Sequence, residues 1–505
     1  MRKPVGTGSS GRSRSRRLVA LGADLYGSLL DEPRYEADSW RVRVQLLRVL
    51  GLLGAAGTLI VTSPTAGAST GLTNWPQYLG GPDHSSFTTA TTITKTNAAS
   101  LHLIRSVSLG NLQASPSVVD GVAYVGSLSG NFYAVNLSTG KKIWTRNLGK
   151  VPALTCSARG VTSTAAVLPD PQTGVLSVYV GGGDGFLYAL NASDGAVQWK
   201  TIVGAPRSPT QNDYYNWSSP AVINGKIYDG VSSQCDAPFV RGGVQEFDQH
   251  TGALLNTAFS MPPGQVGAGV WSSVATDGST VWATTGSTTP PPAPQGESYS
   301  MLQLDASTLT ENGVWTIPLI DRGFDADFGA SPTIFTATLA GTPTQMIGAC
   351  NKNGFFYAFR ATNVAAGPVW KTKIGIGQGG AGAKACLAAA IWDGSNLFLG
   401  GNPVVLNGTK YEGSVAELDP STGAIIWQTG VAGVVLGSPT MNAAGVIAAS
   451  TFDTGTQNGT YLIDSSNGTV LRKIANGSAF AQPVMAGGYL ILETKGTGSF
   501  KIFGP

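Results

Sequence analysis

Two aspartates, Asp325 and Asp327, lie two residues apart in the segment FDADFGASP. On an extended segment, side chains two residues apart point to the same face, so the two carboxylates would lie close together. Close carboxylates raise the pKa of one member or require a nearby cation. This arrangement suits a general base, which holds an unprotonated carboxylate next to a donor proton. The alternative is that both side chains cap backbone amides in a loop.

Three other side chains could take part in ligand binding. Trp271 lies among glycines, which permit the close approach of a flat ligand that stacks on the indole, although it could also pack between structural repeats. Arg159 could hold a ligand carboxylate by two hydrogen bonds, or it could belong to a buried structural pair. Lys352 lies in an Asn-Lys-Asn-Gly turn, where an exposed lysine is the ordinary outcome.

The composition argues against several other kinds of site. Three histidines in 505 residues are too few for a His-rich metal centre. The first 68 residues hold 10 of the 32 basic and 5 of the 29 acidic side chains, so the remainder holds 22 basic and 24 acidic ones. That remainder offers no basic surface for nucleic acid or an anionic membrane. The glycine clusters precede no helical pattern, which argues against a phosphate-binding loop.

The elements that must position these residues come from a repeat. One phrase recurs, in which a strand ends in an apolar residue and Asn or Asp, a turn resembling Thr-Gly follows, and a second strand ends in most copies in Trp. Its seven copies span residues 132–144, 187–199, 244–256, 301–315, 356–370, 415–427 and 460–472. The steps between copies are 45 to 59 residues long, which is typical of a repeat architecture. Hairpin signals before each phrase complete a unit of four strands.

Units of four strands at this spacing predict the blades of an all-β propeller. After the seventh phrase, residues 478–504 supply three strands, and residues 101–109 form a strand without preceding partners. Pairing these segments predicts an eighth blade built from both ends of the chain, which removes exposed sheet edges. Seven blades is the alternative. The repeated Trp residues are expected to pack between blades.

At these repeats the chain resembles the pyrroloquinoline quinone (PQQ) repeat proteins, and among them most resembles the quinoprotein alcohol dehydrogenases and polyvinyl-alcohol-dehydrogenase-like proteins. The resemblance covers residues 74–503, and residues 74–87 resemble the family's entry segment, so we expect residues 69–100 to lead into the propeller. It implies a propeller over residues 101–505. In catalytic members, it implies PQQ on the central axis above a Trp floor, beside a metal ion and an Asp base.

The resemblance also implies roles for single residues. Trp271 matches the floor Trp, Asp325 matches the catalytic base, and Asp327 matches a second carboxylate that some members use for a larger cation. Lys352 matches the cation that reaches the quinone oxygens. Arg159 matches the partner of a quinone carboxylate. The implied cofactor is PQQ with Ca²⁺ or a lanthanide ion.

Two positions depart from the family pattern. The Glu that binds the metal should stand four residues before Arg241, where this chain has Ala237. The Asn ligand that follows the Thr-Gly of ATTG is Ser287 here. Hard cations need several oxygen ligands, so two of the expected metal ligands are absent.

The first 68 residues resemble an export signal with a long basic n-region. The apolar run of residues 49–61 is too short to span a bilayer, and Ala66-Gly67-Ala68 fits a cleavage site. We expect cleavage after Ala68, a secreted chain and no remaining membrane span. An uncleaved anchor is the alternative.

Four cysteines in an oxidising compartment favour two disulfides. Three pairings are possible, and the one that joins neighbouring repeats is Cys156–Cys235 with Cys350–Cys386; buried free thiols are the alternative.

The sequence is compatible with two functions. The first is an exported oxidoreductase in which Asp325 takes the hydroxyl proton of an alcohol while PQQ accepts a hydride. The second is a non-catalytic propeller that binds a protein or a carbohydrate of the cell envelope, which the absence of metal ligands at Ala237 and Ser287 favours.

Overall fold

The repeated phrase forms a tight hairpin. Strand β5 (Asn131–Asn136) ends at Asn136, and strand β6 (Lys142–Asn147) begins after the turn. The Asn136 side-chain oxygen accepts a hydrogen bond of 2.9 Å from the backbone N–H of Thr139, and Gly140 takes a left-handed conformation with a φ of 69°. The side-chain oxygen replaces a backbone acceptor, and glycine takes the positive φ without steric cost. The turn therefore requires the Asn or Asp and the Gly of the phrase.

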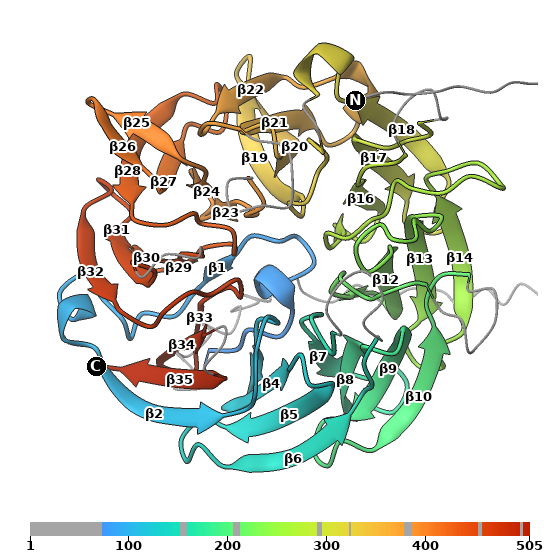
Figure 1. Ribbon diagram of the computed structural model, residues 1–505, viewed down its shortest axis with the longest axis horizontal. Helices are drawn as coiled ribbons and strands as arrows, with labels where there is room; N and C mark the ends of the chain where they lie inside the picture. Colours follow the sequence, from blue (N-terminus) through green and yellow to red (C-terminus); the bar gives the residue numbers. More distant parts are fainter. Residues whose placement is uncertain are drawn as a thin grey trace, which may run out of the picture. The chain divides into compact units, whose positions relative to one another are not determined.

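The computed structural model describes residues 73–151, 159–205, 213–289, 295–322, 325–377, 386–452, 457–494 and 498–505. The predicted export signal at residues 1–68 and Cys156 lie outside the described residues. The described residues form eight antiparallel blades of four strands, arranged in a ring (Figure 1). The eight-bladed prediction is therefore confirmed, and the seven-bladed alternative is wrong.

Blades 1 to 4 each use four consecutive strands, and the first strand of each blade is the innermost. Blade 1 contains β3 (Ser117–Val119), β4 (Val122–Gly126), β5 and β6. Blade 2 contains β7 (Ala166–Pro169), β8 (Leu176–Gly181), β9 (Phe186–Asn191) and β10 (Val197–Ile202). Blade 3 contains β11 (Ala221–Ile223), β12 (Lys226–Val231), β13 (Gly243–Asp248) and β14 (Leu254–Phe259). Blade 4 contains β15 (Ala275–Thr276), β16 (Thr280–Thr284), β17 (Ser300–Asp305) and β18 (Glu311–Thr316).

Blades 5 to 7 follow the same order with two additions. Blade 5 contains β19 (Thr333–Leu339), β20 (Thr342–Cys350), β21 (Phe355–Arg360) and β22 (Trp370–Lys373). Blade 6 contains β23 (Ile391–Trp392), β24 (Leu397–Gly401), β27 (Gly413–Leu418) and β28 (Ile425–Val431), and it carries the hairpin of β25 (Val404–Leu406) and β26 (Thr409–Tyr411). Blade 7 contains β29 (Thr440–Asn442), β30 (Val446–Ser450), β31 (Thr460–Asp464) and β32 (Val470–Ile474), and β1 (Phe87–Thr88) pairs with β29 in parallel.

Blade 8 joins the two ends of the described chain. It contains β33 (Val484–Ala486), β34 (Tyr489–Thr494) and β35 (Ser499–Gly504), with β2 (His102–Ser108) as the outer strand. Strand β2 is antiparallel to β35, and Val107 lies opposite Phe500. The predicted closure of the ring by pairing residues 101–109 with the final strands is therefore confirmed.

Residues 73–88, which we call the axial clasp, run inside the ring (Figure 1). The clasp meets the innermost strands, or the turn next to them, of blades 8, 1, 2, 3, 4, 5, 6 and 7 in that order. The contacts join Thr73 to Gly487, Trp75 to Val118, Pro76 to Val167, Gln77 to Val222, Pro82 to Thr276, Asp83 to Ile334, Ser85 to Trp392, and Ser86 to Met441. Each is a backbone hydrogen bond, except that the side chain of Gln77 makes the contact with Val222. One short segment therefore touches every blade.

The apolar core lies between neighbouring blades, as the repeated Trp residues predict. Trp144 of blade 1 donates its indole N–H to the carbonyl of Ala192 in blade 2 at 2.8 Å. Trp370 makes the equivalent bond to Pro420 at 3.0 Å. The indole of Trp370 also covers Gly423, whose φ is 71° and whose added Cβ would lie 2.4 Å from the ring. The prediction that these Trp residues pack between blades is confirmed.

Helical structure in the described ranges is limited to short 3-10 turns. They are η1 (Tyr78–Gly80), η2 (Ala98–Ser100), η3 (Leu319–Asp321) and η4 (Val364–Ala366). Across the part of the chain that the structure describes, no helix is both long enough and apolar enough to cross a membrane.

Candidate active site

A cavity of about 860 Å³ lies where segments from all eight blades meet. The sequence-predicted residues Trp271, Asp325, Asp327, Lys352 and Arg159 all line it. The structure therefore brings together side chains from blades 2, 4 and 5, which lie up to 193 positions apart in the chain.

Lys352 forms the centre of the charged part of this cavity. Its Nζ lies 2.5 Å from Asp327 Oδ1 and 3.1 Å from Asp325 Oδ1. The side chains of Lys352 and Asp327 are each 3% exposed, whereas that of Asp325 is 26% exposed. The two carboxylates thus face one cation, and Asp325 is the one that a ligand in the cavity can reach.

Burial and charge shift the pKa values of this group. Burial raises the pKa of Asp327 to about 6, although the positive charge of Lys352 opposes the rise. Burial lowers the pKa of Lys352, but the charges of Asp327 and Asp325 outweigh it and leave that pKa above the ordinary value. The ammonium therefore stays charged at neutral pH.

Local hydrogen bonds fix the segments that carry these side chains. The Lys352 turn connects β20 with β21, and the Asn351 side-chain oxygen accepts the backbone N–H of Asn353 at 2.9 Å. The backbone N–H of Lys352 donates to the carbonyl of Asp327 at 3.3 Å. Asp325 has a φ of 55°, a left-handed conformation that Asp adopts more readily than most residues. The alternative that Lys352 is an exposed turn residue is wrong, because its side chain is 3% exposed and lines the cavity.

Trp271 lies against the same segment. Its ring centre is 5.2 Å from Lys352 Nζ. A Cβ added to Gly329 would lie 2.2 Å from Trp271 Cη2, so the indole rests directly on this glycine. The close approach requires a residue without a side chain, as the glycine-rich surroundings of Trp271 suggested. Trp271 lines the cavity and does not fill the space between outer strands.

Arg159 lies in a different part of the cavity wall. Its Nη1 donates to Gln113 Oε1 at 2.6 Å, and its guanidinium carbon lies 5.1 Å from the centre of the Trp217 ring. Its Nε is buried and has no acceptor among the described residues. A buried guanidinium N–H without a partner indicates that an anionic group fits here.

Asp236, which was not among the residues predicted from the sequence, lines the cavity, whereas Ala237 does not. Asp236 Oδ2 lies 3.5 Å from the hydroxyl of Ser287, and burial raises the pKa of Asp236. The backbone N–H of Ser287 donates to Asp327 Oδ2 at 2.8 Å. Asp236 thus supplies a carboxylate beside the two positions where expected ligands are absent. The available signal was an acidic residue immediately before Ala237.

An apolar wall, also missed from the sequence, completes the cavity. It consists of Leu387, Leu436, Phe452 and Phe480, from blades 6, 7 and 8. The rings of Phe452 and Phe480 meet edge to face with their centres 5.7 Å apart. These residues carry no repeat signature, because each lies in a loop before or after a short strand.

The chain is similar to several proteins of known activity. The family model described as "Glucose/ethanol/alcohol dehydrogenase, beta-propeller domain" matches residues 75–373, and the model described as "Outer membrane protein assembly factor BamB" matches residues 360–498. Quinohemoprotein alcohol dehydrogenase ADH IIB of Pseudomonas putida is 28% identical over 312 residues, which cover 54% of this chain and 43% of that protein. Lupanine 17-hydroxylase [cytochrome c] of a Pseudomonas species is 24% identical over 380 residues, which cover 64% and 50%. The chain therefore spans about half the length of these relatives, or less.

Solved structures show the same fold. The quinohemoprotein alcohol dehydrogenase from Comamonas testosteroni superimposes with a TM-score of 0.66 at 19% identity, over 85% of this chain and 80% of that one. A europium-containing methanol dehydrogenase gives 0.67 at 16% identity, over 83% and 89%.

Proposed function

Because this chain belongs to the family of glucose/ethanol/alcohol dehydrogenase β-propeller domains, we propose that it oxidises an alcohol with PQQ held in the axial cavity. The observation that carries the proposal is the group of Asp325, Lys352 and Trp271, in which a partly exposed carboxylate lies beside a buried cation and an aromatic face.

The residues present fit the quinone. Trp271 offers an indole surface for a flat ring system, and Lys352 lies 5.2 Å from that surface. The unpartnered Nε of Arg159 suits a carboxylate of the quinone. When bound, PQQ would supply the acceptor for the hydride of the alcohol.

The residues present do not fit the cation that the family resemblance implies. Among the described residues, no three His, Cys, Asp or Glu side chains are grouped closely enough to hold a metal ion. Asp325 and Asp327 direct oxygens to Lys352 instead, and Ala237 supplies no ligand. We therefore assign no step to Ca²⁺ or a lanthanide, and Lys352 supplies the positive charge beside both carboxylates.

The chain's own residues would prepare the alcohol for reaction. Lys352 contacts Oδ1 of Asp325, which leaves Oδ2 to accept the hydroxyl proton. Lys352 also fixes the orientation of the Asp325 carboxylate through this 3.1 Å contact. Asp327 is buried and bonded to the backbone of Ser287, so it holds Lys352 in place.

The apolar wall would receive the body of the substrate. Leu387, Leu436, Phe452 and Phe480 offer no hydrogen-bonding side chains, so an apolar alcohol would lose less hydration there than a sugar. We therefore propose that the substrate is a small alcohol with an apolar body.

We also propose that the chain acts outside the cytoplasm after cleavage following Ala68. The buried disulfide between Cys350 and Cys386 supports this, because disulfides persist in oxidising compartments. Mass spectrometry of the secreted protein should find an N-terminus near Ser69, and an N-terminus far upstream would contradict cleavage.

A titration of the purified chain with PQQ tests the proposal. We expect saturable quenching of Trp fluorescence and dye-linked oxidation of an alcohol. Arg159→Gln should weaken quinone binding by at least about tenfold, because it removes a charge-assisted contact. Asp325→Asn should bind the quinone like the unmodified chain but lose about 100-fold or more in kcat.

The matched control is Asp194→Asn, on an exposed turn of blade 2, where Asn can still accept the backbone N–H of Ala196. It should change neither binding nor turnover. No saturable quenching, or full turnover by Asp325→Asn, would reject the proposed function. A non-catalytic binding propeller is not favoured, because Trp271, Asp325, Lys352 and Arg159 meet in one cavity.

A further inference from the structure

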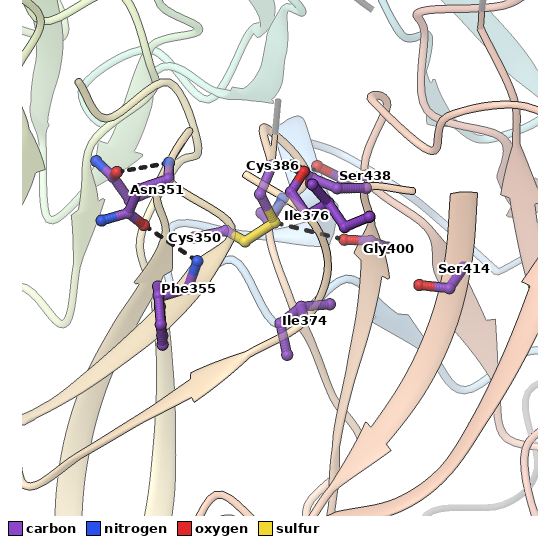
Figure 2. The surroundings of a disulfide bond; sticks show 12 residues. Cys350, Asn351, Phe355, Ile374, Ile376, Cys386, Gly400, Ser414 and Ser438 are labelled. Atoms are coloured by element: carbon purple, nitrogen blue, oxygen red, sulfur yellow. Dashed lines mark hydrogen bonds between the residues drawn. A yellow bond between two sulfur atoms is a disulfide. The ribbon is translucent and has the colours of Figure 1, made fainter. Parts of the chain in front are cut away.

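The disulfide between Cys350 and Cys386 connects two neighbouring blades next to the cavity (Figure 2). Cys350 is the last residue of β20 in blade 5, and Cys386 lies in the segment that leads to β23 of blade 6. Their Cα atoms are 5.6 Å apart, and both side chains are fully buried. In the described part of the chain, these two blades are separate sheets without a shared ladder. The bond therefore adds a covalent link that the strands do not provide.

On one side, the bond anchors the turn that carries Lys352. Cys350 directly precedes this turn, and Asn351, which lies between Cys350 and Lys352, is fully buried. The backbone N–H of Asn351 donates to the carbonyl of Phe355 at 2.9 Å, and the Asn351 side-chain oxygen accepts the backbone N–H of Asn353. The position of Cys350 therefore fixes the backbone of the Lys352 turn, and with it the position of the Lys352 ammonium.

On the other side, the bond anchors Leu387, the residue directly after Cys386. Leu387 is 8% exposed and packs with Trp271. A Cβ added to Gly329 would lie 2.2 Å from Trp271 Cη2 and 2.6 Å from Leu387 Cδ2. Leu387 and Trp271 thus press together on the backbone of Gly329.

The segment of residues 325–329 lies between these two anchors. Its acidic side chains are held by Lys352, and its glycine is covered by Trp271 and Leu387. Asp325, at the beginning of the segment, has a left-handed backbone that needs support from its surroundings.

We propose that Cys350 and Cys386 are positioning residues whose disulfide closes a clamp around residues 325–329. The clamp keeps the Lys352 turn and the Leu387 segment at a fixed separation. It thereby holds the Lys352 ammonium between the carboxylates of Asp325 and Asp327. This inference concerns the geometry of the site and does not depend on the quinone or on turnover.

The test measures how often the Lys352 amine becomes free. The unmodified chain and the double variant Cys350→Ala with Cys386→Ala are exposed to an amine-reactive ester, and modification of Lys352 is followed by mass spectrometry. A buried, paired amine reacts only when the site opens, so the reaction rate reports local opening. Lys226 of blade 3, paired with Glu246 at 2.5 Å, serves as the internal reference.

The stability control is Gly468→Ala in blade 7. Gly468 has a φ of 73°, its added Cβ would lie 2.5 Å from Trp427, and neither residue lines the cavity. This variant should destabilise the fold without loosening the clamp.

We expect the reaction rate at Lys352 to rise about tenfold in the double variant, while that of Lys226 changes less than about twofold. Gly468→Ala should change neither rate by more than about twofold. An unchanged rate at Lys352 in the double variant, or an equal rise in Gly468→Ala, would overturn the proposal. If the double variant does not fold, the double variant Cys350→Ser with Cys386→Ser replaces it, with the same expected rise, because it removes this disulfide and leaves the other cysteines unchanged.

Discussion

Glu493 of β34 is a buried acid without a partner, and its replacement by Gln should stabilise the protein. It is 3% exposed, and neither carboxylate oxygen has a hydrogen-bond partner among the described residues. The pairing of the two innermost strands can be compared from blade to blade. In this comparison Glu493 of blade 8 stands at the position that is occupied by Gly126 in blade 1, Gly230 in blade 3 and Gly400 in blade 6. A Cβ at each of those glycines would press on the next blade, so Glu493 faces the interface between blades 8 and 1.

Burial raises the pKa of Glu493 well above its ordinary value. In the unfolded chain this carboxyl ionises with a pKa of about 4.3, so folding at neutral pH requires the uptake of a proton. That uptake costs up to about 4 kcal/mol at pH 7 and under about 1 kcal/mol near pH 4.5. Because the folded-state pKa is raised, the contribution to stability is full below about pH 4.3 and is lost as the pH rises towards the folded-state pKa.

Glu493→Gln keeps the shape of the side chain and removes this titration. We expect the free energy of unfolding, measured by urea denaturation, to rise by up to about 4 kcal/mol at pH 7 and by under about 1 kcal/mol near pH 4.5. The control is Glu412→Gln, whose side chain is 43% exposed, and it should stay within about 0.5 kcal/mol at both pH values. Equal or lower stability of Glu493→Gln at pH 7, or the same change at both pH values, would refute the reasoning.

Two further predictions concern packing and charge. Gly423→Ala should lower the free energy of unfolding, measured by urea denaturation, by at least about 2 kcal/mol, because the new Cβ would lie 2.4 Å from Trp370. The control is Gly174→Ala, which has the same φ of 71° but open space around it and should lose only about 1 kcal/mol. Equal losses in the two variants would contradict a role for the contact with Trp370. Lys352→Ala should bind Tb³⁺ at least about tenfold more tightly than the unmodified chain, because the variant lacks the positive charge that neutralises the carboxylates of Asp325 and Asp327. Terbium luminescence excited through Trp271 measures this, and unchanged affinity would show that Lys352 does not compete with cations.

The repeat carried most of the information on the fold. Most copies of the phrase encode a turn through Asn or Asp and Gly, and five of the seven copies end in a Trp that packs between blades, so counting copies predicted the blades. The unpaired segment of residues 101–109 predicted the closure, because a lone strand requires a partner. Asp325, Asp327 and Lys352 were found from short motifs that resemble a family, and the structure places them within hydrogen-bond distance.

Other features left no readable signal. Most contacts of the axial clasp use backbone groups, which any residue except proline can provide as donors, so they produce no pattern of residue types. Asp236 was missed because the family resemblance places the expected Glu at position 237, whereas the carboxylate of this chain stands one residue earlier. Glu493 lies in a strand whose alternation is otherwise ordinary, and its burial depends on the neighbouring blade.

The axial clasp also has a consequence for how many repeats such a ring can contain. Its eight attachment points follow one another within residues 73–86, and each is matched to a different blade. A duplicated repeat would find no attachment point, and a lost repeat would leave one vacant. The number of contacts that residues 73–86 make therefore equals the number of blades. We expect the gain or loss of a blade during evolution to require a matching change in the length of this segment.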